Sequence, residues 1–274
     1  MESRSFKITN KDDLVYIQFP KLLECDCVHH IFSTRHGGVS TGDASTMNLS
    51  FSKDTSKENV VRNFEILCSA VGIGTENLVL SHQTHTNNVI TVNESHRGTG
   101  FCKPSFCDVD GMVTNVPNVA LVTQYADCTP LAFCDPVKRV IATSHAGWRG
   151  TVKLIGKRTV EKMMNEFNCN PKDIIVGIGP NIGQCCYEVD DLVIDEFRKL
   201  DFLNLSDFVV AKDNGKYMLN LSEANRQILI FSGIDPENID VGDICTCCNS
   251  EDLHSHRATG GKRGNLALII ELKA

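Results

Sequence analysis

The stretch S-H-A-G-W-R-G, residues 144–150, marks the point where the predicted fold and a predicted site meet. It follows the apolar run 139–143 (R-V-I-A-T), which is typical of a buried strand. It precedes residues 151–168, whose apolar positions recur at helical spacing. A helix start after His145 would favour anions through its free N–H groups and its dipole, and Arg149 would add a phosphate contact. The alternative is a tight strand–helix turn with a core Trp and a hydrogen-bonded His.

Composition indicates an ordinary globular protein, with 42% hydrophobic and 22% charged residues in a chain of 274. The net charge is −7 and no Lys/Arg-rich block occurs, which argues against nucleic acid or an anionic membrane surface as a partner. The sequence shows no repeat, low-complexity tract or linker. We therefore predict a single domain that spans residues 1–274.

The cysteine count and the N-terminus bear on the compartment. The first ten residues are polar and resemble no signal peptide, and no apolar stretch is long enough for a membrane span. The chain contains 13 Cys, which in the cytoplasm would stay reduced and serve as small buried residues or metal ligands. We expect a cytoplasmic protein.

Strand patterns outnumber helix patterns, and the two do not alternate strictly. This favours a mixed α/β (α+β) fold, with a mixed sheet flanked by helices, over a doubly wound sheet. Helices are expected along 60–71, 151–168, 190–200 and 222–233. Strands are expected at 14–19, 28–33, 78–80, 88–92, 111–114, 119–123, 131–134, 139–143, 173–178, 216–221 and 266–272.

Familiar catalytic motifs are missing from the sequence. The glycines of G-I-G-P-N-I-G, residues 177–183, resemble a dinucleotide fingerprint, but the spacing is one residue too long and Pro180 removes a needed N–H group. No nucleophile elbow, Walker loop or H-E-x-x-H motif occurs. A Rossmann-type site is therefore rejected.

For two further clusters, a structural role is favoured over a role in chemistry. The run C-T-C-C, residues 245–248, contains a C-x-x-C with His254 and His256 downstream, but no second C-x-x-C follows. Buried thiols or a tight turn are therefore favoured over a metal site. Asp108 and Asp110 would suit an acid/base pair, although a solvated turn is the default interpretation.

The better candidate for chemistry is distributed along the chain. His85, Cys128 and His145 each lie in a predicted turn beside a strand, among small or polar residues. Two imidazoles and a thiolate are good ligands for zinc or copper, and three protein ligands leave a fourth position open, as in catalytic zinc sites. Whether the three residues converge is left open by the sequence.

Several short motifs occur in a characteristic order along the chain. They are F-S-T-R-H-G-G-V-S (32–40), N-L (48–49), Asn63, Q-T-H (83–85), D-V-D-G (108–111), D-C-T-P (127–130), H-A-G-W-R-G (145–150), G-P-x-I-G (179–183), C-Y-E-V (186–189) and C-T (245–246). Together they resemble one known family, the YfiH-type laccase-domain or polyphenol oxidase proteins, which are also described as purine nucleoside phosphorylases with adenosine deaminase activity. The resemblance runs from about residue 28 to the C-terminus.

The resemblance implies a YfiH-like α/β fold and a metal, zinc or copper, held by His85, Cys128 and His145. It also implies phosphorolysis of adenosine, inosine and 5′-methylthioadenosine. One departure concerns the C-terminal segment, where many bacterial members carry a double Arg and a T-G-R. Here Arg257 and Arg263 are the candidates for those substrate contacts, and the second Arg of the pair is missing.

Phosphorolysis requires cationic groups and N–H donors for phosphate and a proton donor for the leaving base. The candidates for phosphate binding are Arg35, Arg149 and the helix start after His145. The candidates for proton transfer are Asp127 and His82. A zinc ion with an open position would also lower the pKa of a water for adenosine deamination. The expected partners are therefore purine nucleosides and inorganic phosphate, bound by a monomer or a homodimer.

Two alternatives remain at this point. The His₂Cys composition of the metal ligands also matches a copper oxidase of phenols. A multicopper enzyme, however, needs a further cluster with many His-x-His pairs, and this chain has nine His and one such pair. The other alternative is a non-catalytic zinc protein.

Overall fold

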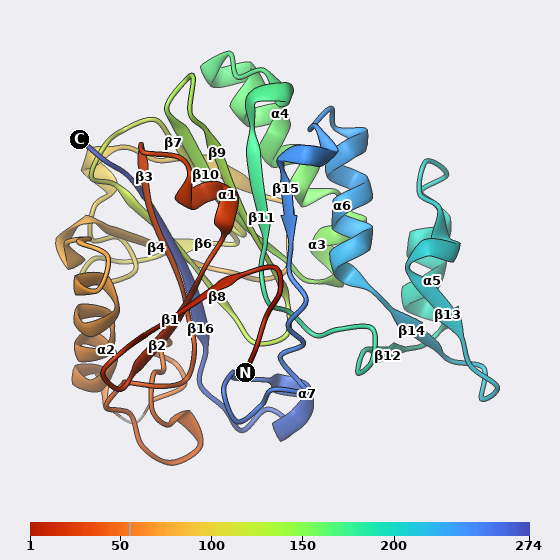
Figure 1. Ribbon diagram of the computed structural model, residues 1–274, viewed down its shortest axis with the longest axis horizontal. Helices are drawn as coiled ribbons and strands as arrows, with labels where there is room; N and C mark the ends of the chain where they lie inside the picture. Colours follow the sequence, from red (N-terminus) through yellow and green to blue (C-terminus); the bar gives the residue numbers. More distant parts are fainter. Residues whose placement is uncertain (55) are drawn as a thin grey trace.

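The computed structural model describes residues 1–54 and 56–274, and its centre is a pair of β-sheets packed face to face (Figure 1). The first sheet has seven strands in the order β1-β2-β3-β16-β8-β4-β6, with antiparallel pairs around β16 and parallel pairs around β4. Its strands are β1 (Lys7–Lys11), β2 (Leu14–Gln18), β3 (Val28–Ser33), β4 (Leu78–His82), β6 (Phe106–Cys107), β8 (Ala120–Tyr125) and β16 (Leu266–Leu272).

The second sheet has six strands in the order β15-β11-β9-β10-β7-β5. Its middle is antiparallel, and its two edge strands pair in parallel with β11 and β7. Its strands are β5 (Val89–Thr91), β7 (Gly111–Thr114), β9 (Thr129–Asp135), β10 (Val140–Ala146), β11 (Ile175–Ile178) and β15 (Ile239–Val241).

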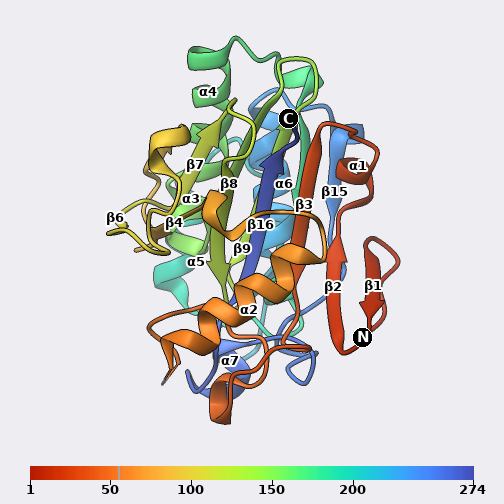
Figure 2. The same cartoon turned by 90° about the vertical axis from the view of Figure 1, so that its left-hand side faces the viewer.

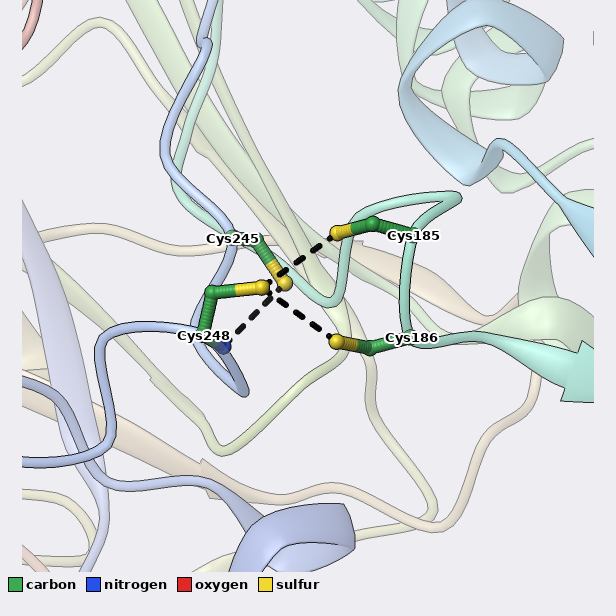
Figure 3. Close-up of side chains that lie close together, drawn as sticks. All are labelled: Cys185, Cys186, Cys245 and Cys248. Atoms are coloured by element: carbon green, nitrogen blue, oxygen red, sulfur yellow. Dashed lines mark hydrogen bonds between the residues drawn. The ribbon is translucent and has the colours of Figure 1, made fainter.

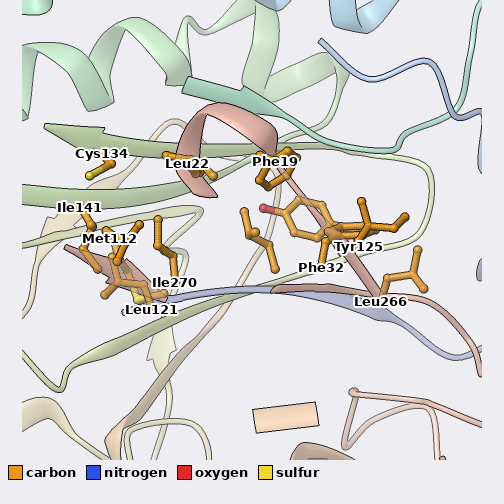
Figure 4. Close-up of a cluster of buried hydrophobic side chains, with 14 of the residues drawn as sticks. Phe19, Leu22, Phe32, Met112, Leu121, Tyr125, Cys134, Ile141, Leu266 and Ile270 are labelled. Carbon is orange, nitrogen blue, oxygen red and sulfur yellow. The ribbon is translucent and has the colours of Figure 1, made fainter. Parts of the chain in front are cut away.

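The largest hydrophobic core lies between these two sheets. Figure 4 shows side chains of the first sheet, such as Leu121 and Ile270, packed with Met112 and Ile141 of the second. Every residue of β16 is buried, because the opposite face of its sheet is also covered. This explains why its sequence is apolar at nearly every position and does not alternate.

Helices cover the outer face of each sheet, so the layers run helix, sheet, sheet, helix. The helix α2 (Lys57–Ser69) lies across the seven-stranded sheet (Figure 2), where Val60, Phe64 and Leu67 form its buried stripe. The helices α4 (Ile155–Phe167) and α6 (Leu221–Phe231) pack on the six-stranded sheet.

A third, smaller sheet stands at one side of the molecule, on the right in Figure 1. It packs with α5 (Asp191–Arg198) and with Trp148 around its own hydrophobic cluster. Its strands are β12 (Glu188–Val189), β14 (Tyr217–Leu219) and β13 (Val209–Ala211), and the remaining short helices are α1 (Pro20–Leu23), α3 (Trp148–Val152) and α7 (His256–Thr259).

The mixed α/β class predicted from the sequence is confirmed, although the strands form three sheets where one was expected. The predicted helix 151–168 is wrong at its start. Leu154 adopts a left-handed conformation with φ 62°, which separates the five-residue α3 from α4. Within the described residues, no helix combines the length and the apolar character needed to cross a membrane.

The packing between the sheets predicts a strong effect of truncating Ile270, which is fully buried. We expect Ile270→Ala to lower the free energy of unfolding by about 2–5 kcal/mol, because it removes apolar contacts and leaves a cavity. Urea unfolding followed by circular dichroism measures this. The control is Val137→Ala at a position that is 69% exposed, where the change should stay within about 0.5 kcal/mol. Equal effects of the two substitutions would contradict the assigned core.

Candidate active site

Three segments at one edge of the sheets bring His85, Cys128 and His145 together. His85 follows β4, Cys128 lies between β8 and β9, and His145 is the penultimate residue of β10. The nitrogen and sulfur atoms that could bind a metal all lie within 4.8 Å of one another, with 3.7 Å between Cys128 Sγ and His85 Nε2. Two imidazoles and one thiolate suit zinc or copper.

A buried carboxylate, Asp110, fixes two of these residues. The backbone N–H groups of Thr84, His85 and Thr86 donate to it over 2.8–3.2 Å, and the Thr86 hydroxyl donates over 2.8 Å. His145 Nδ1 lies 2.8 Å from Asp110 Oδ1. Burial alone would raise the pKa of Asp110, but the hydrogen bonds from His145 and Thr86 hold it at about 2. Because the carboxylate is ionised, Nδ1 of His145 is the donor and Nε2 is left for the cluster.

The cluster favours a thiolate at Cys128. Burial raises the pKa of this thiol, but the charge and hydrogen bonds of His145 and His85 outweigh burial and lower the pKa to about 6. Burial likewise lowers the pKa of His145, but the Cys128 sulfur and Asp110 raise it to about 9. The thiolate is the form of cysteine that binds metals.

Gly147 makes room for this cluster. A Cβ at this position would lie 2.8 Å from His85 Cδ2 and 2.9 Å from Cys128 Sγ, closer than real Cβ atoms come. Gly147 also precedes α3, so the backbone passes beside the three donors with no side chain between them. The donor set, the carboxylate behind His145 and this glycine together fit a metal ion.

A pocket of about 420 Å³ opens beside the cluster and combines polar and aromatic walls. Arg149 is exposed at its edge, with its guanidinium carbon 4.3 Å from the centre of the Trp148 ring. The lining residues are His85, Ala126, Asp127, Cys128, Gly147, Trp148, Arg149, Ile182, Tyr187, Leu221, His256, Arg257 and Arg263.

Of the three other arginines predicted to bind substrate, two line the pocket and one does not. Arg257 lines the pocket, donates to the carbonyls of Cys186 and Glu188 over 3.0 and 3.2 Å, and lies beside the Tyr187 ring. Arg263 lines it too and is half-buried, with a hydrogen bond to Asn265. The pocket lining does not include Arg35, whose guanidinium donates to the carbonyls of Ser45 and Ser250 over 2.9 and 2.8 Å.

Of the two residues predicted to transfer protons, only one lines this pocket. Asp127 lines it, and its carboxylate accepts hydrogen bonds from Thr246 Oγ1, Ser255 Oγ and the backbone N–H of Arg257 over 2.6–2.7 Å. His82 is exposed and lines a neighbouring pocket of about 240 Å³, which shares His85 and Cys128 with the first pocket.

Sequence analysis missed the role of Asp110. The solvated turn expected for Asp108 and Asp110 describes Asp108, which is exposed, but is wrong for Asp110, which is fully buried. The pair also does not meet as an acid/base pair, because Asp110 is occupied by its five donors. No local pattern marks Asp110 as buried, because its position beside His145 results from the pairing of β7 with β10.

Comparison with known proteins identifies relatives along most of the chain. A family model described as multi-copper polyphenol oxidoreductase laccase matches residues 29–273. The purine nucleoside phosphorylase YlmD of Bacillus subtilis is 37% identical over 246 residues, which cover 88% of this chain and 87% of that protein. An adenosine deaminase, RL5, from an unknown prokaryotic organism is 33% identical and covers 85% of this chain and 90% of its own.

A solved structure extends the similarity to the whole fold. The protein YfiH of Bacillus licheniformis superimposes with a TM-score of 0.92 at 31% identity and covers 98% of this chain and 100% of its own. The family match over most of the chain, together with relatives of this identity and coverage, shows that the chain belongs to the laccase-like, YfiH-type family that its motifs predicted.

Proposed function

We propose that the chain is a purine nucleoside phosphorylase that cleaves adenosine, inosine and 5′-methylthioadenosine with phosphate, and that it also deaminates adenosine. The observation that carries the proposal is one pocket that combines the His85–Cys128–His145 cluster with a free arginine and aromatic walls. Relatives that are named purine nucleoside phosphorylase or adenosine deaminase support an enzyme of this kind.

Arg149 is the best candidate for phosphate. Its guanidinium stands at the pocket over Trp148 and, within the described residues, makes no hydrogen bond there, so its donors remain for a ligand. The planar fork of arginine matches phosphate oxygens in a bidentate way. Because α3 has only five residues, the side chain of Arg149 would contribute more to phosphate binding than the helix dipole. Arg263 and Arg257 add positive charge to the same pocket.

The walls of the pocket suit a purine nucleoside. Trp148 and Tyr187 offer aromatic surface, and Ile182 and Leu221 offer aliphatic surface. Aromatic rings stack on planar bases, and the pocket volume of about 420 Å³ lies in the usual range for small-molecule sites. The sugar would then lie between the base and the arginine that holds phosphate.

Asp127 is better placed than His82 to exchange a proton with the leaving base, because Asp127 lines the nucleoside pocket. Thr246 and Ser255 donate to Oδ1 of Asp127, and the backbone N–H of Arg257 donates to Oδ2. These donors fix the direction of the carboxyl group, and Oδ2 keeps one free position. A proton bound at that position would pass to the nitrogen of the leaving base and leave the carboxylate behind.

The metal site would serve the deamination. A zinc ion held by His85, Cys128 and His145 would supply Lewis acidity and lower the pKa of a water near the purine. Asp110 fixes the Nδ1–H tautomer of His145 and holds the turn of His85, so both imidazoles keep their direction.

The copper oxidase alternative has less support. A multicopper mechanism needs a second cluster rich in histidine, and the other ligand group found among the described residues consists of four cysteines. A non-catalytic zinc protein does not explain why the three-ligand cluster faces a pocket with an unpaired arginine.

The first prediction from this proposal concerns phosphate. Purified protein incubated with adenosine and phosphate should release adenine and ribose 1-phosphate, together with inosine from deamination. Without phosphate, adenine release should stop and inosine formation should continue, because only the first reaction consumes phosphate. Mass spectrometry of the products measures both reactions. Equal adenine release without phosphate would identify a hydrolase and reject the proposal.

Arg149→Ala should weaken the use of phosphate more than nucleoside binding. A lost charge-assisted contact costs about 1.5–3 kcal/mol, which corresponds to a rise in the phosphate KM of roughly ten- to a hundredfold. Steady-state kinetics with each substrate varied measures this. Arg62→Ala, an exposed arginine of α2 paired with Glu65, is the control and should behave as wild type. An unchanged phosphate KM in Arg149→Ala would show that Arg149 does not bind phosphate.

The metal proposal predicts that Cys128→Ser and His145→Ala each lower the zinc content by about one ion per chain, and that deamination falls with it. Elemental analysis of the purified variants measures this. Cys102→Ser, an exposed thiol outside the cluster, is the control and should keep its zinc. Zinc contents equal to wild type in both cluster variants would mean that Cys128 and His145 only pack.

A further inference from the structure

Four cysteines from two distant segments meet at a second place. Cys185 and Cys186 lie in the loop between β11 and β12, and Cys245 and Cys248 lie in a turn after β15. Figure 3 shows the four sulfurs pointing toward one another from these two segments. All four lie within 4.8 Å of one another, and Cys248 Sγ lies 3.4 Å from Cys185 Sγ and 3.3 Å from Cys186 Sγ.

These separations match a tetrahedral metal centre. A Zn–S bond of about 2.3 Å places the sulfurs of a regular tetrahedron about 3.8 Å apart. Four thiol groups gathered this closely gain little from one another, because S–H groups are weak donors and weak acceptors. Four thiolates would repel one another unless a cation lay between them. The cluster therefore has the shape of a site for a thiophilic divalent ion.

Backbone groups support sulfur ligands at Cys245. The N–H groups of Gly183 and Cys248 point at Cys245 Sγ over 3.1 and 3.5 Å, and such donors stabilise a metal-bound thiolate. A Cβ at Gly183 would lie 3.0 Å from Cys245 Cβ and 3.2 Å from Cys185 Sγ, so the glycine permits the close approach of the two segments. Asn249 also closes the turn through two hydrogen bonds to the Cys245 carbonyl.

We propose that Cys185, Cys186, Cys245 and Cys248 form a second metal site that binds one Zn²⁺ ion through four thiolates. Four protein ligands close the coordination shell, so this site is structural and takes no part in the chemistry at His85, Cys128 and His145. The ligands form an adjacent C-C pair followed by a C-x-x-C. This pattern differs from the two C-x-x-C pairs that are typical of zinc sites.

The site would cross-link a loop that lines the pocket to the turn of Cys245 and Cys248. Ile182 and Tyr187, which flank the first cysteine pair, line the pocket. On the other segment, Thr246 donates to Asp127 over 2.6 Å, and Arg257 reaches back to the carbonyl of Cys186. Binding of zinc in the folded state alone would stabilise this wall by linkage.

Zinc analysis in a His145→Ala background tests the proposal, because the first site then contributes no zinc. The protein is purified under a thiol reductant without chelator, after zinc has been supplied and the excess removed. About one zinc ion per chain should remain. Cys185→Ser and Cys248→Ser added to this background should each remove it and lower the midpoint of thermal unfolding. Cys102→Ser added in the same way is the control and should keep the metal.

Cobalt keeps the test decisive if a cysteine variant does not fold. The His145→Ala protein, with all four cysteines present, is stripped of zinc and refilled with Co²⁺. Strong sulfur-to-cobalt charge-transfer bands and intense tetrahedral d–d bands are expected, since both grow with the number of thiolate ligands. Loss of these bands on addition of Zn²⁺ would show that the two ions share the site.

Three results would overturn the proposal. They are zinc content that the cysteine substitutions do not change, a Co²⁺ spectrum without sulfur charge-transfer bands, and a disulfide between any two of the four cysteines in peptide mass mapping of the reduced preparation. None of these results tests the metal site proposed at His85, Cys128 and His145. Failure of the metal site proposed at His85, Cys128 and His145 would instead appear as unchanged zinc in Cys128→Ser with the second site intact, and failure of the proposed phosphorolysis as adenine release without phosphate.

Discussion

The hydrogen bonds of one buried carboxylate, Asp110, hold the candidate active site and the local fold together. A buried charge is costly unless it is paired and hydrogen-bonded, and Asp110 is fully buried. It is satisfied by the turn at residues 84–86 and by His145, while its own carbonyl accepts the backbone N–H of His145 over 2.7 Å. Three segments must therefore be in place before this charge can be buried. The same constraint positions two of the three candidate metal ligands.

Strand register supplies the third ligand. In the pairing of β9 with β10, His145 lies opposite Pro130 and Ala146 opposite Thr129, so Cys128 enters at the same end of the sheet as His145. On the other side of β10, Ser144 pairs with Gly111, which places Asp110 beside His145. A shift of either pairing by one residue would turn these side chains to the opposite face of the sheet. The site thus depends on register in the six-stranded sheet as much as on the identity of its ligands.

The sequence predicted the parts of this structure that depend on local pattern. The strands 28–33, 111–114 and 266–272 were predicted with the bounds that the structure has, because each is a short apolar run between turn residues. Apolar spacing could not reveal the left-handed Leu154 that splits the predicted helix, since a single backbone conformation leaves no periodic signal. Asp110 was predicted to be solvated, although it is buried, because its burial depends on segments that are distant in sequence.

In the site, too, local sequence pattern was informative and contacts between distant segments could not be predicted. Residue type and turn context selected His85, Cys128 and His145, and their geometry then fits a metal, but the role of each remains a proposal. Arg35 was selected on the same grounds, yet its guanidinium is used by the carbonyls of Ser45 and Ser250. A cationic side chain in a glycine-rich turn serves equally well to bind a phosphate or to satisfy backbone carbonyls. Sequence cannot separate these uses, because they differ only in which partner the fold brings near.

The two ligand clusters differ in a way that follows from where they lie. His85, Cys128 and His145 are supported by strands and by a buried carboxylate, so three ligands suffice to fix their geometry and one face is left open to the pocket. The four cysteines come from loops, and Cys185 and Cys248 are exposed. Hydrogen bonds near the surface compete with water, so a closed four-thiolate centre would add stability that these loops do not gain from regular secondary structure. The metal would then fix the loop that ends at Tyr187, as the strands and Asp110 fix the cluster of His85, Cys128 and His145.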